Sequence, residues 1–326
     1  MRLRLGIVER CGGPSQDGTR SGARESWMVT EPWLVIITRI GVGISRDSYY
    51  RHRLRVAELA LAGSLRAQTD KSFTWVLVSD VRAPAWVDGE LEGLAAGLSF
   101  DIWRRDPTVV GINPVDRPAV RAMIAARPTI LSRCDDDDLL HRTYAARTRQ
   151  ELAGSAPPSA LTFVRGGYLF EGQVYPKRYP WFTAGLAVLP DGRAQITPYL
   201  FNHAFFGMNM RQRGFEAREI TTPHPMWLRS VSAASDSAAG CRFRPRWWQR
   251  PARVTFADFG ATAESIEQLG NALAEAPGPP NPNPGRSRLA QKRELAEQIR
   301  SLRRASVDSD EDDPEIERLT KALYDV

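Results

Sequence analysis

Short apolar runs alternate with amphipathic segments along the first half of the chain. Runs rich in β-branched and aromatic residues predict buried strands at 34–40, 73–79, 99–103 and 128–132. The apolar residues between and after these runs follow helical spacing, which predicts helices over 50–68, 88–98, 117–126 and 139–154. Strands separated by helices indicate an α/β fold with a mixed, mostly parallel sheet flanked by helices.

The second half of the chain has a different pattern. Short apolar runs at 161–164, 168–170 and 185–189 are separated by glycine-containing turns, which favours hairpins or a mixed sheet edge. A helix is predicted over 203–214, because Gly214 follows the last periodic residue. The segment 221–250 is rich in loop-forming and aromatic residues.

The two ends of the chain are predicted to lie outside the main domain, 33–260. Residues 1–32 are turn-rich and lack a periodic apolar face, so we expect a disordered arm, with Met28 as an alternative start. A connecting segment and a proline-rich linker follow over 261–285, because Pro277–Gly285 cannot continue a helix. Residues 286–326 are expected to form a charged helical tail, basic first and acidic afterwards.

Composition excludes several classes of protein. The densest apolar run, Trp33–Ile37, falls far short of the ~18 residues of a membrane span. The cysteines, Cys11, Cys134 and Cys241, are odd in number and widely spaced, which indicates a reducing compartment and a cytoplasmic protein. The net charge of +6 suits anionic ligands, whereas the scattered basic residues do not predict nucleic-acid binding. Peripheral attachment to the inner membrane face and self-association through the tail stay open.

Four adjacent carboxylates, Asp135 to Asp138, follow the fourth predicted strand directly. Adjacent carboxylates repel one another by ~1 kcal/mol per close pair even in water, so they need a counter-charge. A divalent cation supplies it, and hard oxygen ligands select Mg²⁺, Mn²⁺ or Ca²⁺. The alternative is a solvated acidic helix start, in which Asp137 and Asp138 face the positive end of the helix dipole.

Two further polar residues end predicted strands. Arg39 lies at the end of the first strand, and Asp80 ends the second. Ligands of parallel sheets bind at the carboxyl ends of the strands, so both residues belong to the same edge as the acidic run. Asp80 is either a turn residue or a carboxylate that accepts a hydrogen bond from the imino group of a nucleobase.

These residues together resemble a known family. Residues 64–80 resemble the pattern S-L-x-x-Q-T-x-x-x-F-x-x-x-x-V-x-D of inverting, nucleotide-sugar-dependent glycosyltransferases with the GT-A fold, and Asp135–Asp138 stands where their D-x-D-D motif lies. Within that group the chain is most similar to the rhamnosyltransferase family. The further matching residues are Thr38-Arg39, Arg53, Phe73-Thr74-Trp75, Pro84 and the R-x-D-x-D-D pattern from Arg133 to Asp138.

The resemblance covers 33–260 and implies a GT-A-like domain with a nucleotide-sugar-binding half, 33–155, and an acceptor-binding half, 156–260. It implies metal-dependent transfer of a sugar, with rhamnose as the specific suggestion, from a UDP- or dTDP-sugar. The acceptor would be a glycan, a lipid-linked saccharide or a small glycoside, and the anomeric configuration would invert. The residues expected to bind the nucleotide sugar are Thr38, Arg39, Asp80, Arg133, Asp135 and Asp136. The metal, Mn²⁺ or Mg²⁺, is expected on Asp135, Asp137 and Asp138.

Inversion requires a general base near the acceptor hydroxyl. Related sequences carry an acidic pair eleven to twelve residues before the glycine of an R-x-x-G-[FY] helix end. Arg211–Phe215 fits that helix end, and eleven residues before its glycine stands His203. We expect His203 to be the base, because imidazole accepts a proton near neutral pH. The reserve carboxylates are Glu171, Asp191 and Asp236.

Two other functions stay open. Related sequences have a His-Gly-x-Asn element after the tryptophan at position 227, whereas this chain has Ser232-Ala233-Ala234-Ser235, with His224 as a substitute. This departure favours a degenerate, non-catalytic protein that binds anionic ligands or glycans. The acidic run also fits a metal-dependent enzyme acting on phosphate esters, which would release free phosphate instead of a nucleoside diphosphate.

Overall fold

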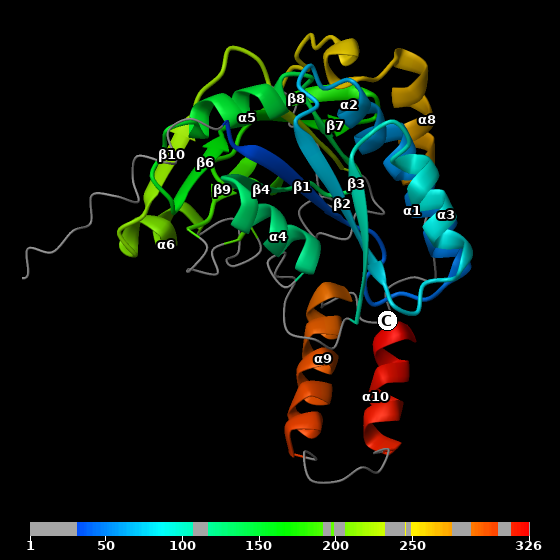
Figure 1. Cartoon of the computed structure of the whole chain (residues 1–326). Coiled ribbons are helices and arrows are strands. Elements are labelled where there is room, and N and C mark those ends of the chain that lie inside the picture. The colour runs from blue at the N-terminus through cyan, green and yellow to red at the C-terminus, as the bar shows by residue number, and fades with distance from the viewer. Residues whose placement is uncertain are drawn as a thin grey trace, which may run out of the picture. The chain divides into compact units, whose positions relative to one another are not determined.

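The computed structural model describes residues 31–106, 117–191, 197–198, 206–231, 245, 249–275, 288–305 and 314–325. Its main element is a seven-stranded sheet in the order β10-β6-β9-β4-β1-β2-β3 (Figure 1). The strands are β1 (Trp33–Arg39), β2 (Phe73–Asp80), β3 (Phe100–Arg105), β4 (Thr129–Arg133), β6 (Ser159–Phe163), β9 (Leu186–Leu189) and β10 (Glu216–Ile220). Only β9 runs antiparallel to its neighbours, so the mostly parallel α/β sheet is confirmed.

Helices cover both faces of this sheet, because the strands are apolar on both sides. Leu34 and Ile36 pack on one face with α1 (Asp47–Ala57), η2 (Glu58–Ala62), α2 (Gly63–Arg66), α3 (Trp86–Leu94) and α5 (Tyr144–Leu152). Val35 and Ile37 point the other way and pack with α4 (Pro118–Ala126). This alternation of neighbouring residues is the period of two expected of a strand buried on both faces.

The single helix predicted over 50–68 is divided. A π-helical turn, η2, separates α1 from α2. Gly63, at the start of α2, lies against Gly260, and a Cβ added to Gly260 would stand 2.3 Å from the Gly63 carbonyl oxygen. Gly260 also has a φ of +65°, so this close backbone approach depends on glycine at position 260.

A second sheet has the order β5-β11-β7-β8. Its strands are β5 (Asp138–Leu140), β11 (Trp227–Ser230), β7 (Arg165–Phe170) and β8 (Gln173–Arg178). One face packs on η6 (Phe256–Phe259) and α8 (Ala263–Ala274), through Leu139, Leu228 and Leu269. The prediction of a helix from residue 139 is wrong at its start, because Leu139 and Leu140 pair with β11 and the helix begins only at Tyr144.

The remaining elements are η4 (Thr183–Gly185), α6 (Phe206–Gln212), α9 (Arg288–Ala305) and α10 (Pro314–Asp325). The last two form a helical pair with an apolar cluster of its own, which includes Ile299 and Leu319. The expected charged helical tail is thereby confirmed, whereas the domain boundaries stay predictions. In the part of the chain that the structure describes, no helix has the length and apolar character needed to cross a membrane.

Candidate active site

Three predicted site residues end neighbouring strands of the main sheet. β4, β1 and β2 lie side by side and run parallel, so Arg133, Arg39 and Asp80 share one edge. Beyond Arg133 the chain forms a turn, Cys134–Asp138, which we call the acid turn and which leads from the main sheet into the second sheet. Its backbone is held at both ends, by Cys134 N–H donating to Ile37 O (3.1 Å) and Asp138 N–H donating to Asp135 O (3.2 Å).

Asp136 is held by a buried ion pair with Arg53 of α1. Arg53 Nε donates to Asp136 Oδ2 at 2.8 Å and Nη2 donates to Oδ1, and these side chains are only 11 % and 6 % exposed. The same Nη2 lies 3.5 Å from Asp137 Oδ2. Burial raises the pKa of Asp136 to about 6, although the charge and hydrogen bonds of Arg53 act against this rise. The ion pair therefore fixes the acid turn to α1.

Asp135 has a different counter-charge. Its Oδ1 accepts hydrogen bonds from Arg133 Nε (3.2 Å) and Nη2 (3.0 Å), while Oδ2 has no protein partner among the described residues. Burial raises the pKa of Asp135, but Arg133, Arg39 and Arg229 outweigh it and bring the pKa to about 2. Asp135 is thus an ionised carboxylate with one oxygen available to a ligand.

Asp138 is part of strand β5 and is only 2 % exposed. Its Oδ2 is buried and accepts no hydrogen bond from the described residues. Burial raises the pKa of Asp138 well above its usual range, Asp137 and Asp135 raise it further, and Arg229 opposes them. Asp138 does not begin a helix, so the alternative of an acidic helix start is wrong.

The residues of the S-L-x-x-Q-T pattern hold the chain that follows the acid turn. Ser64 Oγ accepts a hydrogen bond from Leu140 N–H at 3.2 Å. Gln68 donates to His141 O at 2.9 Å and accepts from Ala145 N–H at 2.9 Å. The pattern therefore fixes β5 and the start of α5, and with them one end of the acid turn.

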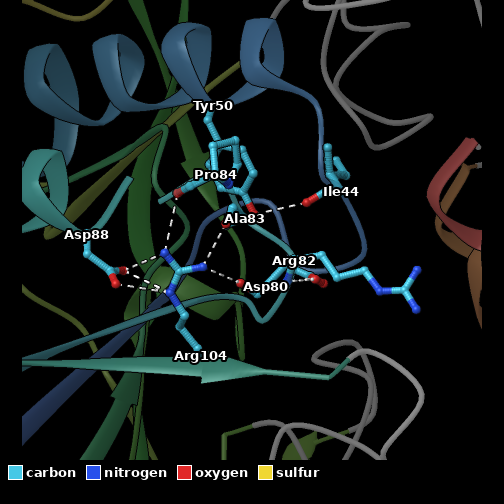
Figure 2. A network of polar contacts seen from close by, with 8 residues as sticks. All are labelled: Ile44, Tyr50, Asp80, Arg82, Ala83, Pro84, Asp88 and Arg104. Carbon is cyan, nitrogen blue, oxygen red and sulfur yellow. Dashed lines mark hydrogen bonds and ion pairs between the residues drawn. The ribbon is translucent and has the colours of Figure 1, made fainter. Parts of the chain in front are cut away.

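Asp80 organises the loop that follows β1. Its carboxylate accepts hydrogen bonds from the backbone N–H groups of Gly43 (Oδ2, 2.6 Å) and Arg82 (Oδ1, 2.8 Å), and Asp80 is fully buried. Figure 2 shows Tyr50 beside it, donating to Ile44 O at 3.0 Å, and Arg104 donating to the Asp80 and Ala83 carbonyls. These contacts hold the loop at the carboxyl edge of the sheet.

The remaining predicted site residues lie partly at the same edge and partly outside the described residues. Thr38 is fully buried, and its hydroxyl accepts a hydrogen bond from Trp75 Nε1 at 2.9 Å. Arg39 lies close enough to Asp135 to lower its pKa. His203 lies outside the described residues, as does Asp236. His224 stacks on His141, with ring centroids 6.0 Å apart.

Sequence reasoning missed Arg229 and Tyr168. The pairing of β11 with β5 places Arg229 opposite Asp138, and its pairing with β7 places Tyr168 opposite Arg229, although both residues lie far from Asp138 along the chain. No local pattern marks either residue. Arg53 was noted only as a matching residue, and the structure reveals its carboxylate partner.

Comparison with known proteins identifies one family. A model of the family described as "Putative rhamnosyl transferase" matches residues 45–242. A search of curated proteins returned no match. Among solved structures, a cytidylyltransferase from Leptospira borgpetersenii is 12 % identical, with a TM-score of 0.34 over 60 % of this chain and 77 % of that chain. Mouse xyloside xylosyltransferase 1 is 13 % identical, with a TM-score of 0.33 over 59 % and 85 %. A "putative nucleotide-diphospho-sugar transferase" from Desulfovibrio desulfuricans is 10 % identical, with a TM-score of 0.33 over 60 % and 80 %.

Proposed function

The chain belongs to this rhamnosyl transferase family and is a glycosyltransferase, and from that premise we propose a metal-assisted, inverting transfer from a UDP- or dTDP-sugar, with rhamnose as the sugar. The acceptor is a glycan, a lipid-linked saccharide or a small glycoside. The observation that carries the proposal is the acid turn, placed between two sheets at the edge that also bears Arg39 and Asp80. Ligands of such sheets bind at this edge.

Asp80 is the residue proposed to recognise the pyrimidine. A carboxylate can accept about four hydrogen bonds. Asp80 accepts two from backbone N–H groups, so it can still accept one from the imino N–H of a pyrimidine. Because Asp80 is buried, its contact with a base requires the loop after β1 to shift. Thr38 and Arg39, at the end of β1, complete the proposed nucleotide site.

The donor set of the acid turn fits a hard divalent cation. Among the described residues, no three His, Cys, Asp or Glu side chains are grouped to hold a metal by themselves. Mg²⁺ and ions like it need fewer, because one or two carboxylates together with substrate phosphates suffice. Within the described part of the chain, Asp135 has one oxygen without a hydrogen-bond partner, Asp138 has a buried oxygen without one, and Asp137 stands between them in the sequence. When bound, Mn²⁺ or Mg²⁺ would neutralise the charge that develops on the departing diphosphate.

Two arginine side chains are also proposed to stabilise the negative charge of the diphosphate. Arg133 and Arg39 lie at the edge of the acid turn, and a guanidinium donates in a fork that matches phosphate oxygens. Asp136 is committed to Arg53, which supports a positioning role for this carboxylate instead of direct contact with the nucleotide. His203 remains the residue proposed as general base on the acceptor hydroxyl. A cytoplasmic location is proposed as well.

Ligand-induced thermal stabilisation tests this function. Wild type, Asp137→Ala and the control Asp47→Ala, whose side chain is 56 % exposed, are heated with Mn²⁺ and with UDP, dTDP or GDP. Binding stabilises by RT ln(1 + [L]/Kd), which is ~2.7 kcal/mol at a hundredfold excess over Kd. We expect a metal-dependent shift with one pyrimidine nucleotide that Asp137→Ala loses and Asp47→Ala keeps. No shift with any nucleotide would overturn the proposal and favour the non-catalytic alternative.

A further inference from the structure

One row of residues crosses the second sheet beside the acid turn. The strand register places Asp138 opposite Arg229, Arg229 opposite Tyr168, and Tyr168 opposite Tyr175. Residues paired across neighbouring strands present their side chains to the same face of a sheet. These four side chains therefore form one row, which we call the Tyr168 row, and the acid turn lies at its Asp138 end.

The Tyr168 row lies where the apolar core ends. In the next row toward the interior, Leu140 and Trp227 are fully buried, and a Cβ added to Gly166 would stand 2.2 Å from the Trp227 ring. Arg229 and Tyr168, by contrast, are half-buried. Tight apolar packing is therefore replaced by polar side chains at this row.

The groups of the row act on one another. Burial raises the pKa of Tyr168, the charge of Arg229 on the neighbouring strand lowers it, and the charge of Asp138 raises it. The guanidinium carbon of Arg229 lies 5.3 Å from the Phe182 ring centroid, which fixes its position.

A second cation stands next to the row. Lys177 Nζ lies 5.5 Å from the Tyr168 ring centroid, and Lys177 is exposed. No carboxylate among the described residues forms an ion pair with it. Its charge is thus available to a ligand that lies over Tyr168.

We propose that the Tyr168 row binds the acceptor, and that this acceptor is a saccharide carrying a carboxylate or another anionic group. The Tyr168 ring stacks on the apolar face of a sugar, as aromatic side chains with one polar end can. Lys177, together with Arg229 on the neighbouring strand, faces the anionic group. This inference rests on the proposed function, because the row serves as an acceptor site only if the acid turn holds the donor.

Adjacent residues of β8 provide a matched pair of variants. Lys177 faces the Tyr168 row, whereas Arg178, which pairs with Arg165, points to the opposite face. Fluorescently labelled full-length protein is applied, without nucleotide, to an array of neutral and uronic-acid-bearing oligosaccharides. The proteins compared are wild type, Tyr168→Ala, Tyr168→Leu, Lys177→Gln and Arg178→Gln. Melting temperatures and the nucleotide-induced shift are measured on the same preparations.

We expect wild type and Arg178→Gln to bind acidic saccharides, with about tenfold weaker binding for Tyr168→Ala and Tyr168→Leu. Lys177→Gln should lose the preference for acidic over neutral saccharides. Binding that the Tyr168 and Lys177 variants retain, binding of neutral saccharides only, or no saccharide binding by wild type would each overturn the inference. The nucleotide shift separates the two proposals: a wild type that binds nucleotide but no saccharide refutes only the acceptor site.

Discussion

At the scale of single residues, the site is a set of neighbouring carboxylates, two of which have separate arginine partners. Arg53 neutralises Asp136, and Arg133 neutralises Asp135. Asp138 has no hydrogen-bond donor for one oxygen among the described residues. Since an unpaired buried charge is costly, the arginines decide which carboxylates stay ionised and which oxygens remain for a ligand.

Arg53→Met is expected to destabilise the protein strongly. Removing one partner of a buried ion pair leaves the other charge uncompensated, which costs about 3–5 kcal/mol. Arg55→Met, which removes an exposed pair with Glu275 at 3.6 Å, is the control and should cost less than about 1 kcal/mol. Urea unfolding measures the free energy of unfolding of both variants. Equal losses of stability would show that the ion pair between Arg53 and Asp136 does not hold the acid turn. The double variant Arg53→Met/Asp136→Leu should recover much of the stability.

His141 predicts an acid-sensitive contribution to stability. Burial lowers its pKa below 6.5, and His224 and Arg142 lower it further against the opposing effect of Asp258. The unfolded chain therefore binds a proton more readily than the folded one. The neutral His141 side chain therefore contributes to the stability of the folded protein above pH 6.5, and this contribution is lost as the pH falls through the pKa of His141 in the folded state. In His141→Asn, the free energy of unfolding should vary less with pH in this window, and an unchanged pH profile would contradict the assignment.

At the scale of elements, a helix turn and a strand hold each other through side chains. Gln68, after α2, bridges the carbonyls of Ser64 and His141 and accepts from Ala145 N–H. Buried backbone groups of this kind need partners. The S-L-x-x-Q-T pattern thereby specifies where β5 ends and where α5 begins.

Gln68→Met keeps the length of the side chain but removes its hydrogen bonds. Each buried backbone group left without a partner costs about 1–3 kcal/mol, so we expect a clear loss of stability. Gln150→Met, at an exposed position that accepts one bond from Arg147, is the control and should stay within about 0.5 kcal/mol of wild type. Midpoints of urea unfolding measure both effects. A Gln68 variant as stable as its control would show that water replaces the lost bonds.

At the scale of the whole molecule, the acid turn joins two sheets that share one core, because Leu140 and Trp227 of the second sheet pack in the same apolar cluster as Leu34 of the main sheet. One face of the main sheet packs with α1, α3 and α5, while the outer face of the second sheet packs with α8. A turn held between two packed sheets keeps its carboxylates in place despite their mutual repulsion. The helices α9 and α10 have a further cluster that draws on neither sheet.

Deletion of residues 276–326 should leave the transferase domain intact. Because the apolar cluster of α9 and α10 contains, among the residues that the structure describes, members of those two helices alone, we expect Tm to stay within about 2 °C of wild type. The nucleotide-induced shift should persist. Size-exclusion chromatography and liposome flotation of the same protein test whether the charged tail mediates self-association or membrane attachment. A large loss of Tm would show that the tail stabilises the domain.

The sequence by itself determined the alternation of strands and helices, the parallel sheet and the edge to which Asp80 and the acidic run belong. These features follow from the spacing of apolar residues and from the order of elements, which are local properties. The family was likewise evident from short motifs, since 64–80 and 133–138 are each a continuous stretch of the chain.

The tertiary structure alone decided which charges meet. Arg53 reaches Asp136 from a helix 83 residues earlier, and strand pairing places Arg229 opposite Asp138 and Tyr168 opposite Arg229. The same pairing makes a strand of residues 138–140, where local spacing predicted a helix. Burial and partners, which set the ionisation of each carboxylate, depend on these long-range contacts, and no local pattern of residues encodes them.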